Sequence, residues 1–121
     1  DESKLDVLCD ILNSEGVDKI ILFEETKRRV DKLTKQLNKR GIVSREIHGD
    51  KSQNARQKAL NAFKKGHVKV LVATDVAARG IDVDDVTHVI NYQVPQSYDT
   101  YIHRIGRTGR AGKVGRAFTF V

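Results

Sequence analysis

The sequence predicts an α/β fold in which a mainly parallel sheet is flanked by helices on both faces. Short, almost continuous apolar runs alternate along the chain with segments whose apolar residues recur at helical spacing. Strands buried on both faces of a sheet have such continuous apolar runs, and short connections between strand and helix are typical of parallel sheets. No repeat of domain size and no linker interrupts the pattern, so we expect residues 1–121 to form one domain.

Three helices are predicted in the first half of the chain. The first covers about residues 4–14 and ends before Gly16. We expect Thr26 to cap the N-terminus of the second helix, which stops at Gly41, and Ser52 to cap the third, because their hydroxyls can accept a first-turn N–H. The predicted inner faces are Leu5, Leu8, Cys9 and Leu12 in the first helix, Val30, Leu33 and Leu37 in the second, and Ala55, Ala59, Ala62 and Phe63 in the third.

Short apolar runs predict the strands. These runs cover residues 19–24, 43–47, 69–74, 86–92 and 116–121, and a further helix is expected over residues 97–105. In an open parallel sheet, ligands bind at the carboxyl ends of the strands. Polar segments follow three of the predicted strands, at residues 23–27, 48–50 and 74–82, so we expect the functional site there. Residues 76–82 are predicted to form a loop of small residues, in which Gly80 lets the backbone approach a ligand.

Composition limits the class of protein and its partners. The chain is 39% hydrophobic and 31% charged, as in ordinary folded domains. A net charge of +6 favours a polyanionic partner. Cys9 is the single cysteine, which excludes an internal disulfide and suggests a buried thiol in a reducing, cytoplasmic compartment. No apolar run reaches the about 20 residues of a membrane span, and no residues have metal-ligand spacing, so neither a membrane nor a bound metal is expected.

Residues 101–116 are the most informative segment of the chain. Glycines at positions 106, 109, 112 and 115 alternate with cations at positions 104, 107, 110, 113 and 116. Arginine presents a planar fork of donors that matches phosphate oxygens, and glycine lets the main chain approach a ligand closely. Only four glycine repeats occur and Pro95 is the sole proline, so a collagen helix is excluded. The segment therefore predicts a polyphosphate ligand.

Taken in order, the motifs of this chain resemble those of the C-terminal, RecA-like domain of DEAD-box ATP-dependent RNA helicases. The matching segments are Ile20–Lys27 (motif IV), His48–Asp50 followed by Gln53–Arg56 (the QxxR element), Val72–Asp82 (motif V), Val89–Tyr92 with Pro95, and Tyr101–Arg110 (motif VI). The resemblance covers essentially the whole chain and implies a RecA-like three-layer sandwich. It also implies a second, N-terminal RecA-like domain as partner.

The resemblance implies roles for individual residues. Arg107 and Arg110 would be catalytic arginine fingers that contact ATP, and Asp82 would accept hydrogen bonds from the nucleotide ribose. His103 and Arg104 would join the two domains. The positions implied to hold the RNA backbone, without reading its sequence, are Thr26, Arg56, Thr74 and Gly80.

The chain contains neither a G-x-x-x-x-G-K-[S/T] loop nor a D-E-A-D strand. We therefore expect the N-terminal ATP-binding domain, with the Mg²⁺ that accompanies ATP, to be absent from this chain. The isolated chain is expected to be inactive, and the full-length protein to be an RNA-stimulated ATP hydrolase that unwinds short duplexes.

Simpler interpretations stay open for most of these residues. The arginines of residues 101–116 could be surface charges, Asp82 a turn residue, and His103 a buried structural histidine. Thr26 could serve only as a helix cap and Arg56 could be an exposed helix arginine. For the whole chain, two further functions are open: the motor domain of a DNA helicase or translocase, and a stand-alone basic RNA-binding module without ATPase activity.

Overall fold

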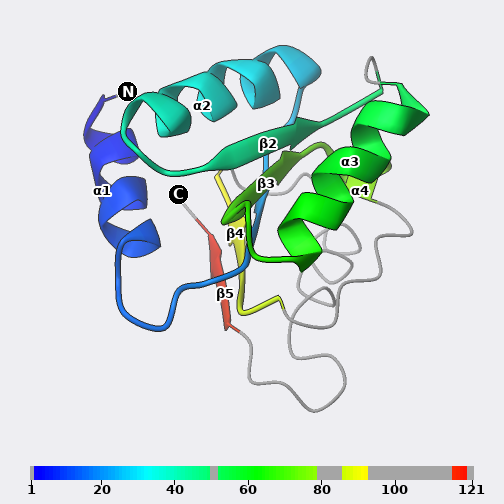
Figure 1. Ribbon diagram of the computed structural model, residues 1–121. Helices are drawn as coiled ribbons and strands as arrows, with labels where there is room; N and C mark the ends of the chain where they lie inside the picture. The colour runs from blue at the N-terminus through cyan, green and yellow to red at the C-terminus, as the bar shows by residue number, and fades with distance from the viewer. Residues whose placement is uncertain (1, 50–51, 79–85, 93–115, 120–121) are drawn as a thin grey trace.

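The computed structural model describes residues 2–49, 52–78, 86–92 and 116–119 (Figure 1). In chain order the elements are α1 (Glu2–Leu12), β1 (Ile20–Phe23), α2 (Lys27–Lys39), β2 (Ser44–Ile47), α3 (Gln53–Lys64), β3 (Val70–Ala73), α4 (Asp75–Ala78), β4 (His88–Asn91) and β5 (Arg116–Thr119). The first three predicted helices and the five predicted strands are confirmed, and their described ends differ from the predicted ends by no more than two residues. Residues 120 and 121 of the last predicted strand lie outside the described residues. The helix predicted over residues 97–105 lies outside the described residues.

The strands form one parallel sheet in the order β2-β3-β1-β4-β5. Phe23, the last residue of β1, stands level with Ala73 of β3 and Asn91 of β4. Ile47, the last residue of β2, is level with Ala73 as well. The carboxyl ends of these four strands therefore meet at one edge of the sheet, where a ligand of a parallel sheet is expected.

Two hydrophobic cores lie on opposite faces of the sheet (Figure 1). Side chains of β1 alternate between them: Ile20 and Leu22 pack with α1 and α2, whereas Ile21 and Phe23 pack with α3 and α4. Each residue of β1 is at most 1% exposed, which explains its continuous apolar run. Cys9 is buried in the first core, as predicted. The predicted three-layer arrangement is confirmed.

The inner face predicted for α3 is partly wrong. Ala55 is exposed, whereas Leu60, which was not predicted to face inward, is 7% exposed. The buried residues of α3 are Ala59, Leu60 and Phe63. Ala55 lies in the first turn of the helix, where α3 passes the end of the edge strand β2 and no further strand covers it. The buried face of α3 therefore begins at Ala59, one turn after Ala55.

Hydroxyl caps and glycines set the ends of the helices, as predicted. Thr26 Oγ1 accepts a hydrogen bond from Arg29 N at 3.2 Å, and Ser52 Oγ accepts one from Ala55 N at 3.0 Å. The backbone at Gly41 has φ = 82°, in the left-handed region that a side chain disfavours, so the chain leaves α2 there.

The segment after β3 differs from the predicted loop. Its first residues form the single helical turn α4, in which Ala78 N donates to the carbonyl of Thr74 at 3.0 Å. Alanine is the best helix former, and Asp75 places an acid at the N-terminus of the turn, where the helix dipole favours it. Within the described residues, no helix is long and apolar enough to cross a membrane.

Candidate nucleic-acid interface

One row of residues follows the level ends of the strands. Glu24 N donates to the carbonyl of Ala73 at 3.1 Å, and Tyr92 N donates to the carbonyl of Phe23 at 3.1 Å. These bonds extend the sheet by one residue on each strand. Thr74 follows β3 in the same row, and Thr26 comes two residues after Glu24 on the neighbouring segment. Two of the predicted RNA-contacting residues thus come from adjacent strands at the same edge.

Thr26 can combine its two proposed roles. Its Oγ1 accepts from Arg29 N, so the predicted helix cap is confirmed. A hydroxyl has one donor hydrogen and two acceptor lone pairs, and capping uses only one lone pair. The O–H of this exposed side chain therefore keeps the capacity to donate to a phosphate oxygen. Capping and RNA contact are compatible, and the RNA contact stays a prediction.

Arg56 is held against the segment that follows β3. Its Nη2 donates to the carbonyl of Ala77 in α4 at 3.4 Å, and the residue is half-buried. The alternative of an exposed helix arginine is therefore wrong. Thr74 is half-buried too, and its carbonyl begins the same turn. Arg56 and Thr74, 18 positions apart in the sequence, both attach to α4, which brings these two predicted residues together.

Buried polar groups stand behind this edge, and sequence reasoning missed them. Glu24 is only 5% exposed, and its Oε1 accepts from Glu25 N at 3.0 Å. Burial, with the nearby Glu24 carboxylate as a second cause, raises the pKa of Tyr92 to about 12. The phenol of Tyr92 is therefore protonated at neutral pH. The ammonium of Lys4 lies 4.2 Å from the centre of the Tyr92 ring.

His48 has a structural partner that sequence reasoning did not predict. Its Nε2 lies 2.9 Å from Oδ1 of Asp31, and its side chain is 3% exposed. A buried polar group needs such a partner because its desolvation is costly. The bond ties the end of β2 to the middle of α2, and so it fixes the start of the connection that leads to Ser52 and α3. The signals in the sequence were a histidine directly after a predicted strand and the match of His48–Asp50 to the family motif.

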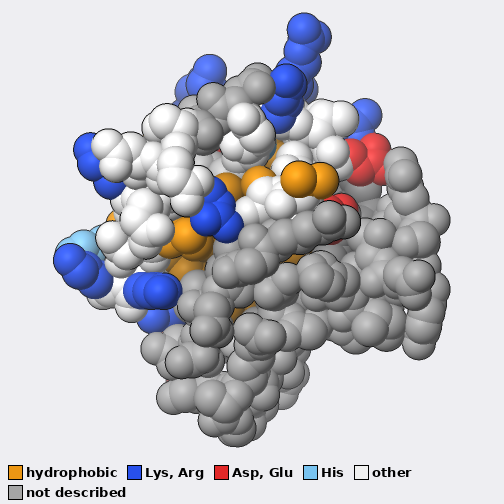
Figure 2. Space-filling view, turned by 90° about the vertical axis from the view of Figure 1, so that its right-hand side faces the viewer, with side chains coloured by type: hydrophobic (Ala, Val, Ile, Leu, Met, Phe, Trp, Pro, Cys, Tyr) orange, Lys and Arg blue, Asp and Glu red, His pale blue; other side chains and the backbone are white. Residues whose placement is uncertain are grey.

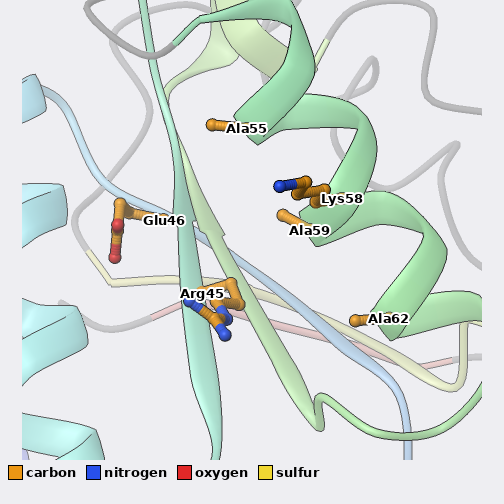
Figure 3. Close-up of a pocket in the computed structure, with 6 residues that line it drawn as sticks. All are labelled: Arg45, Glu46, Ala55, Lys58, Ala59 and Ala62. Atoms are coloured by element: carbon orange, nitrogen blue, oxygen red, sulfur yellow. The ribbon is translucent and has the colours of Figure 1, made fainter.

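A shallow groove of about 200 Å³ lies between β2 and α3 (Figure 3). Its lining residues are Arg45, Glu46, Ala55, Lys58, Ala59 and Ala62. Figure 3 shows Arg45 on the α3 side of the strand and the Glu46 side chain turned to the other side. This groove is smaller than the roughly 300–1,000 Å³ of pockets that enclose small ligands.

One face of the described part of the molecule carries mainly basic charged side chains (Figure 2). Seen from the side, it shows many Lys and Arg side chains and few acidic ones (Figure 2). No group of three or more potential metal ligands occurs in the described part of the chain. The remaining predicted site residues, Gly80, Asp82, His103, Arg104, Arg107 and Arg110, lie outside the described residues.

Comparison with known families agrees with this geometry. The model of the helicase conserved C-terminal domain matches residues 3–112. The chain belongs to the helicase conserved C-terminal domain family. Within that family it is similar to DEAD-box proteins. It is 54% identical over all 121 residues to the ATP-dependent RNA helicase CshA of Listeria monocytogenes and 53% identical to the DEAD-box ATP-dependent RNA helicase CshA of Bacillus subtilis.

The chain spans 23% and 24% of the lengths of these two helicases, about a quarter in each case. Solved structures of DEAD-box proteins have the same fold. The Escherichia coli DEAD-box protein SrmB, bound to a regulator of ribonuclease activity, superposes with a TM-score of 0.90 and 43% identity over 99% of this chain and 71% of its own. Saccharomyces cerevisiae Dbp5, bound to RNA and ADP BeF3, gives a TM-score of 0.88 with 38% identity over 99% of this chain and 32% of its own. The predicted RecA-like fold of this helicase C-terminal domain is confirmed.

Proposed function

We propose that this helicase C-terminal domain is half of the motor of an ATP-dependent RNA helicase and completes its ATP and RNA sites together with an N-terminal RecA-like domain of the same protein. The observation that carries the proposal is the similarity over all 121 residues of this chain, at 52–54% identity, to part of proteins named as ATP-dependent RNA helicases. The level strand ends support it by providing one edge at which two ligands can meet, and Thr26 and Thr74 follow the adjacent strands β1 and β3 at that edge.

RNA is proposed to bind through its sugar-phosphate backbone. Thr26 and Thr74 offer hydroxyl donors, and Arg56 offers a guanidinium that α4 holds in place at Ala77. Gly80 is proposed to expose backbone N–H groups to the same strand. Contacts of this kind fix a strand without reading its bases, so no sequence specificity is expected. Clamping of one strand as the two domains close would open a short duplex.

ATP with Mg²⁺ is proposed to lie mainly on the N-terminal domain, which would hold the metal ion. Binding of the nucleotide together with RNA would close the two domains, and transfer of its terminal phosphoryl group to water, followed by product release, would reopen them. Asp82 is proposed to accept from the ribose hydroxyls, and Arg107 and Arg110 to neutralise charge on the transferring group. His103 and Arg104 are proposed to lie between the domains. A cytoplasmic location is proposed from the single, buried cysteine.

The first test is ATP turnover by the full-length protein, with and without single-stranded RNA. Arginine fingers contribute about 10³–10⁵ in rate, so Arg110→Ala is expected to abolish RNA-stimulated turnover. Lys65→Ala removes an equal charge at the end of α3 and is the matched control, expected to leave turnover unchanged. RNA-stimulated turnover by Arg110→Ala equal to that of the unchanged protein would show that the finger assignment is wrong.

The type of nucleic acid that stimulates ATP turnover distinguishes an RNA helicase from the two alternative functions. RNA presents a 2′-hydroxyl that DNA lacks, so single-stranded RNA is expected to stimulate turnover and DNA of the same sequence is not. Equal stimulation by both would favour a DNA helicase or translocase. RNA binding without any turnover in the full-length protein would leave a basic RNA-binding module as the better account.

A further inference from the structure

Helix α2 has a row of cations on the side opposite the core. Arg28, Lys32, Lys35 and Lys39, which we call the α2 ridge, follow each other at intervals of four, three and four residues and are all exposed. At 100° per residue these positions lie within about 60° of one another around the helix. The buried residues of α2 are Val30, Leu33, Thr34 and Leu37, and they lie on the opposite side. Figure 1 shows α2 as an outer helix, with one side against the sheet.

Acidic neighbours pair with other cations of this region and not with the ridge. Arg29 lies 3.8 Å from Glu25, and Arg40 lies 2.6 Å from Asp6. Asp31, the single acid within α2, is bonded to His48. None of the ridge cations forms an ion pair with a described residue. Like charges three and four positions apart repel each other, so the ridge weakens the isolated helix. An external anion would remove that repulsion.

The shape of the ridge selects a linear polyanion. Neighbouring ridge positions are about 5–6 Å apart and the row extends for about 16 Å along the helix axis. A compact anion would contact two of these cations at most, whereas an extended strand of phosphates can contact all of them. A membrane surface fits less well, because membrane-bound amphipathic helices insert their apolar face, and the apolar face of α2 is already buried in the core.

The position of the ridge favours RNA among linear polyanions. Arg28 lies two residues after Thr26, the helix cap at the proposed RNA edge. A strand that leaves the edge at Thr26 therefore meets the ridge first. We infer that the α2 ridge binds the phosphate backbone of RNA that extends beyond the cleft between the two domains. This inference rests on the proposed function and adds a second RNA surface to it.

The test compares two variants of the full-length protein that remove the same charge. The ridge variant carries R28Q, K32Q, K35Q and K39Q. The control variant carries R45Q, K58Q, K64Q and K65Q, which remove exposed cations from β2 and from the α3 side of the molecule. Each variant is titrated with a short single-stranded oligouridine that fills only the cleft, and with one several times longer.

The ridge variant is expected to bind the long RNA about tenfold more weakly and the short RNA with unchanged affinity. The logarithm of the binding constant falls with the logarithm of salt concentration, and each phosphate contact contributes about 0.7 to the steepness of that fall. Loss of all four ridge cations is therefore expected to make the fall for long RNA less steep by up to about 3. The control variant is expected to keep most of the affinity and slope of the unchanged protein, because its cations lie away from the proposed path.

Three outcomes would overturn the inference. Unchanged binding of long RNA by the ridge variant would show that RNA does not reach α2. Equal losses in the ridge and control variants would show a general effect of net charge. A ridge variant that loses affinity for polyglutamate, a mimic of an acidic protein, while it keeps its affinity for long RNA would show that the partner is a protein. Failure of the unchanged protein to bind even the short RNA would instead contradict the proposed function.

Discussion

Helices α2 and α3 begin in the same way and then serve different purposes. Both are capped by a hydroxyl, Thr26 in α2 and Ser52 in α3, and they pack on opposite faces of the sheet. The cap of α2 follows the central strand β1 directly, so it lies at the proposed RNA edge. The cap of α3 follows the edge strand β2 through a connection. The same local signal therefore has a proposed binding role in one helix and only a structural role in the other.

The two helices also differ in their outer surfaces. The outer side of α2 carries the cationic ridge, whereas α3 presents alanines beside β2 and leaves the groove of Figure 3. The proposed contribution of α3 to RNA binding comes instead from Arg56, which reaches α4. In the proposed function, the two helices therefore differ because of the strand that each follows and the element that its side chains reach, and not because of their caps or lengths.

The largest expected effect tests whether both helices are equally important for stability. Leu37 of α2 and Phe63 of α3 are fully buried in their respective cores. Leu37→Ala is expected to lower the free energy of unfolding by about 2–5 kcal/mol and Phe63→Ala by about 3–5 kcal/mol, because each leaves a cavity. Chemical denaturation measures both. A loss below about 1 kcal/mol in either variant would show that its helix is not part of the cooperative core.

A smaller effect separates the two caps. Thr26→Ala and Ser52→Ala are each expected to cost about 1 kcal/mol of stability, because each leaves a first-turn N–H without its partner. Only Thr26→Ala is expected to weaken RNA binding, by about tenfold for one lost hydrogen bond to a charged group. Thermal denaturation and RNA titration of the two variants measure these effects.

Thr26→Asp sharpens this comparison, because aspartate is a good helix cap but repels phosphate. It is expected to keep the stability of the unchanged protein and still bind RNA weakly. Normal RNA binding by Thr26→Asp, or equal losses of RNA affinity in Thr26→Ala and Ser52→Ala, would reduce Thr26 to a structural cap.

The smallest expected effect is a dependence of stability on pH that comes from only one of the two cores. The core under α1 and α2 contains Tyr92, whose pKa is raised by burial to about 12, whereas the described members of the core under α3 and α4 have no titratable side chain. A raised pKa in the folded state favours the protonated phenol. The contribution of Tyr92 to the free energy of unfolding is therefore fully present below the unfolded pKa of about 10. It is lost as the pH rises toward 12.

Denaturation between pH 9 and pH 12 tests this prediction, with Tyr92→Phe as the control that cannot titrate. The unchanged protein is expected to lose stability relative to Tyr92→Phe over the upper part of this range. A constant difference between the two proteins would show that the phenol ionises as readily in the folded state as in the unfolded one.

The sequence by itself determined the features that depend on near neighbours along the chain. The caps at Thr26 and Ser52, the turn at Gly41 and the buried strands follow from bonds within four residues or from the apolar pattern of a single segment. The order of motifs was sufficient to identify the family. The three predicted RNA-contacting residues that the structure describes all lie at or against one edge of the sheet, because parallel strands with level ends bring distant segments together.

Only the tertiary structure decided which side chains meet across the fold. Two hydrogen bonds join segments that are distant in the sequence, from Arg56 to Ala77 and from His48 to Asp31. Glu24 and Tyr92 are 68 positions apart, and their burial depends on the layers that cover them. The burial of Leu60 and the exposure of Ala55 were likewise decided by which part of α3 packs in the core. Such contacts depend on strand order and register, which the periodicity of a single segment does not contain.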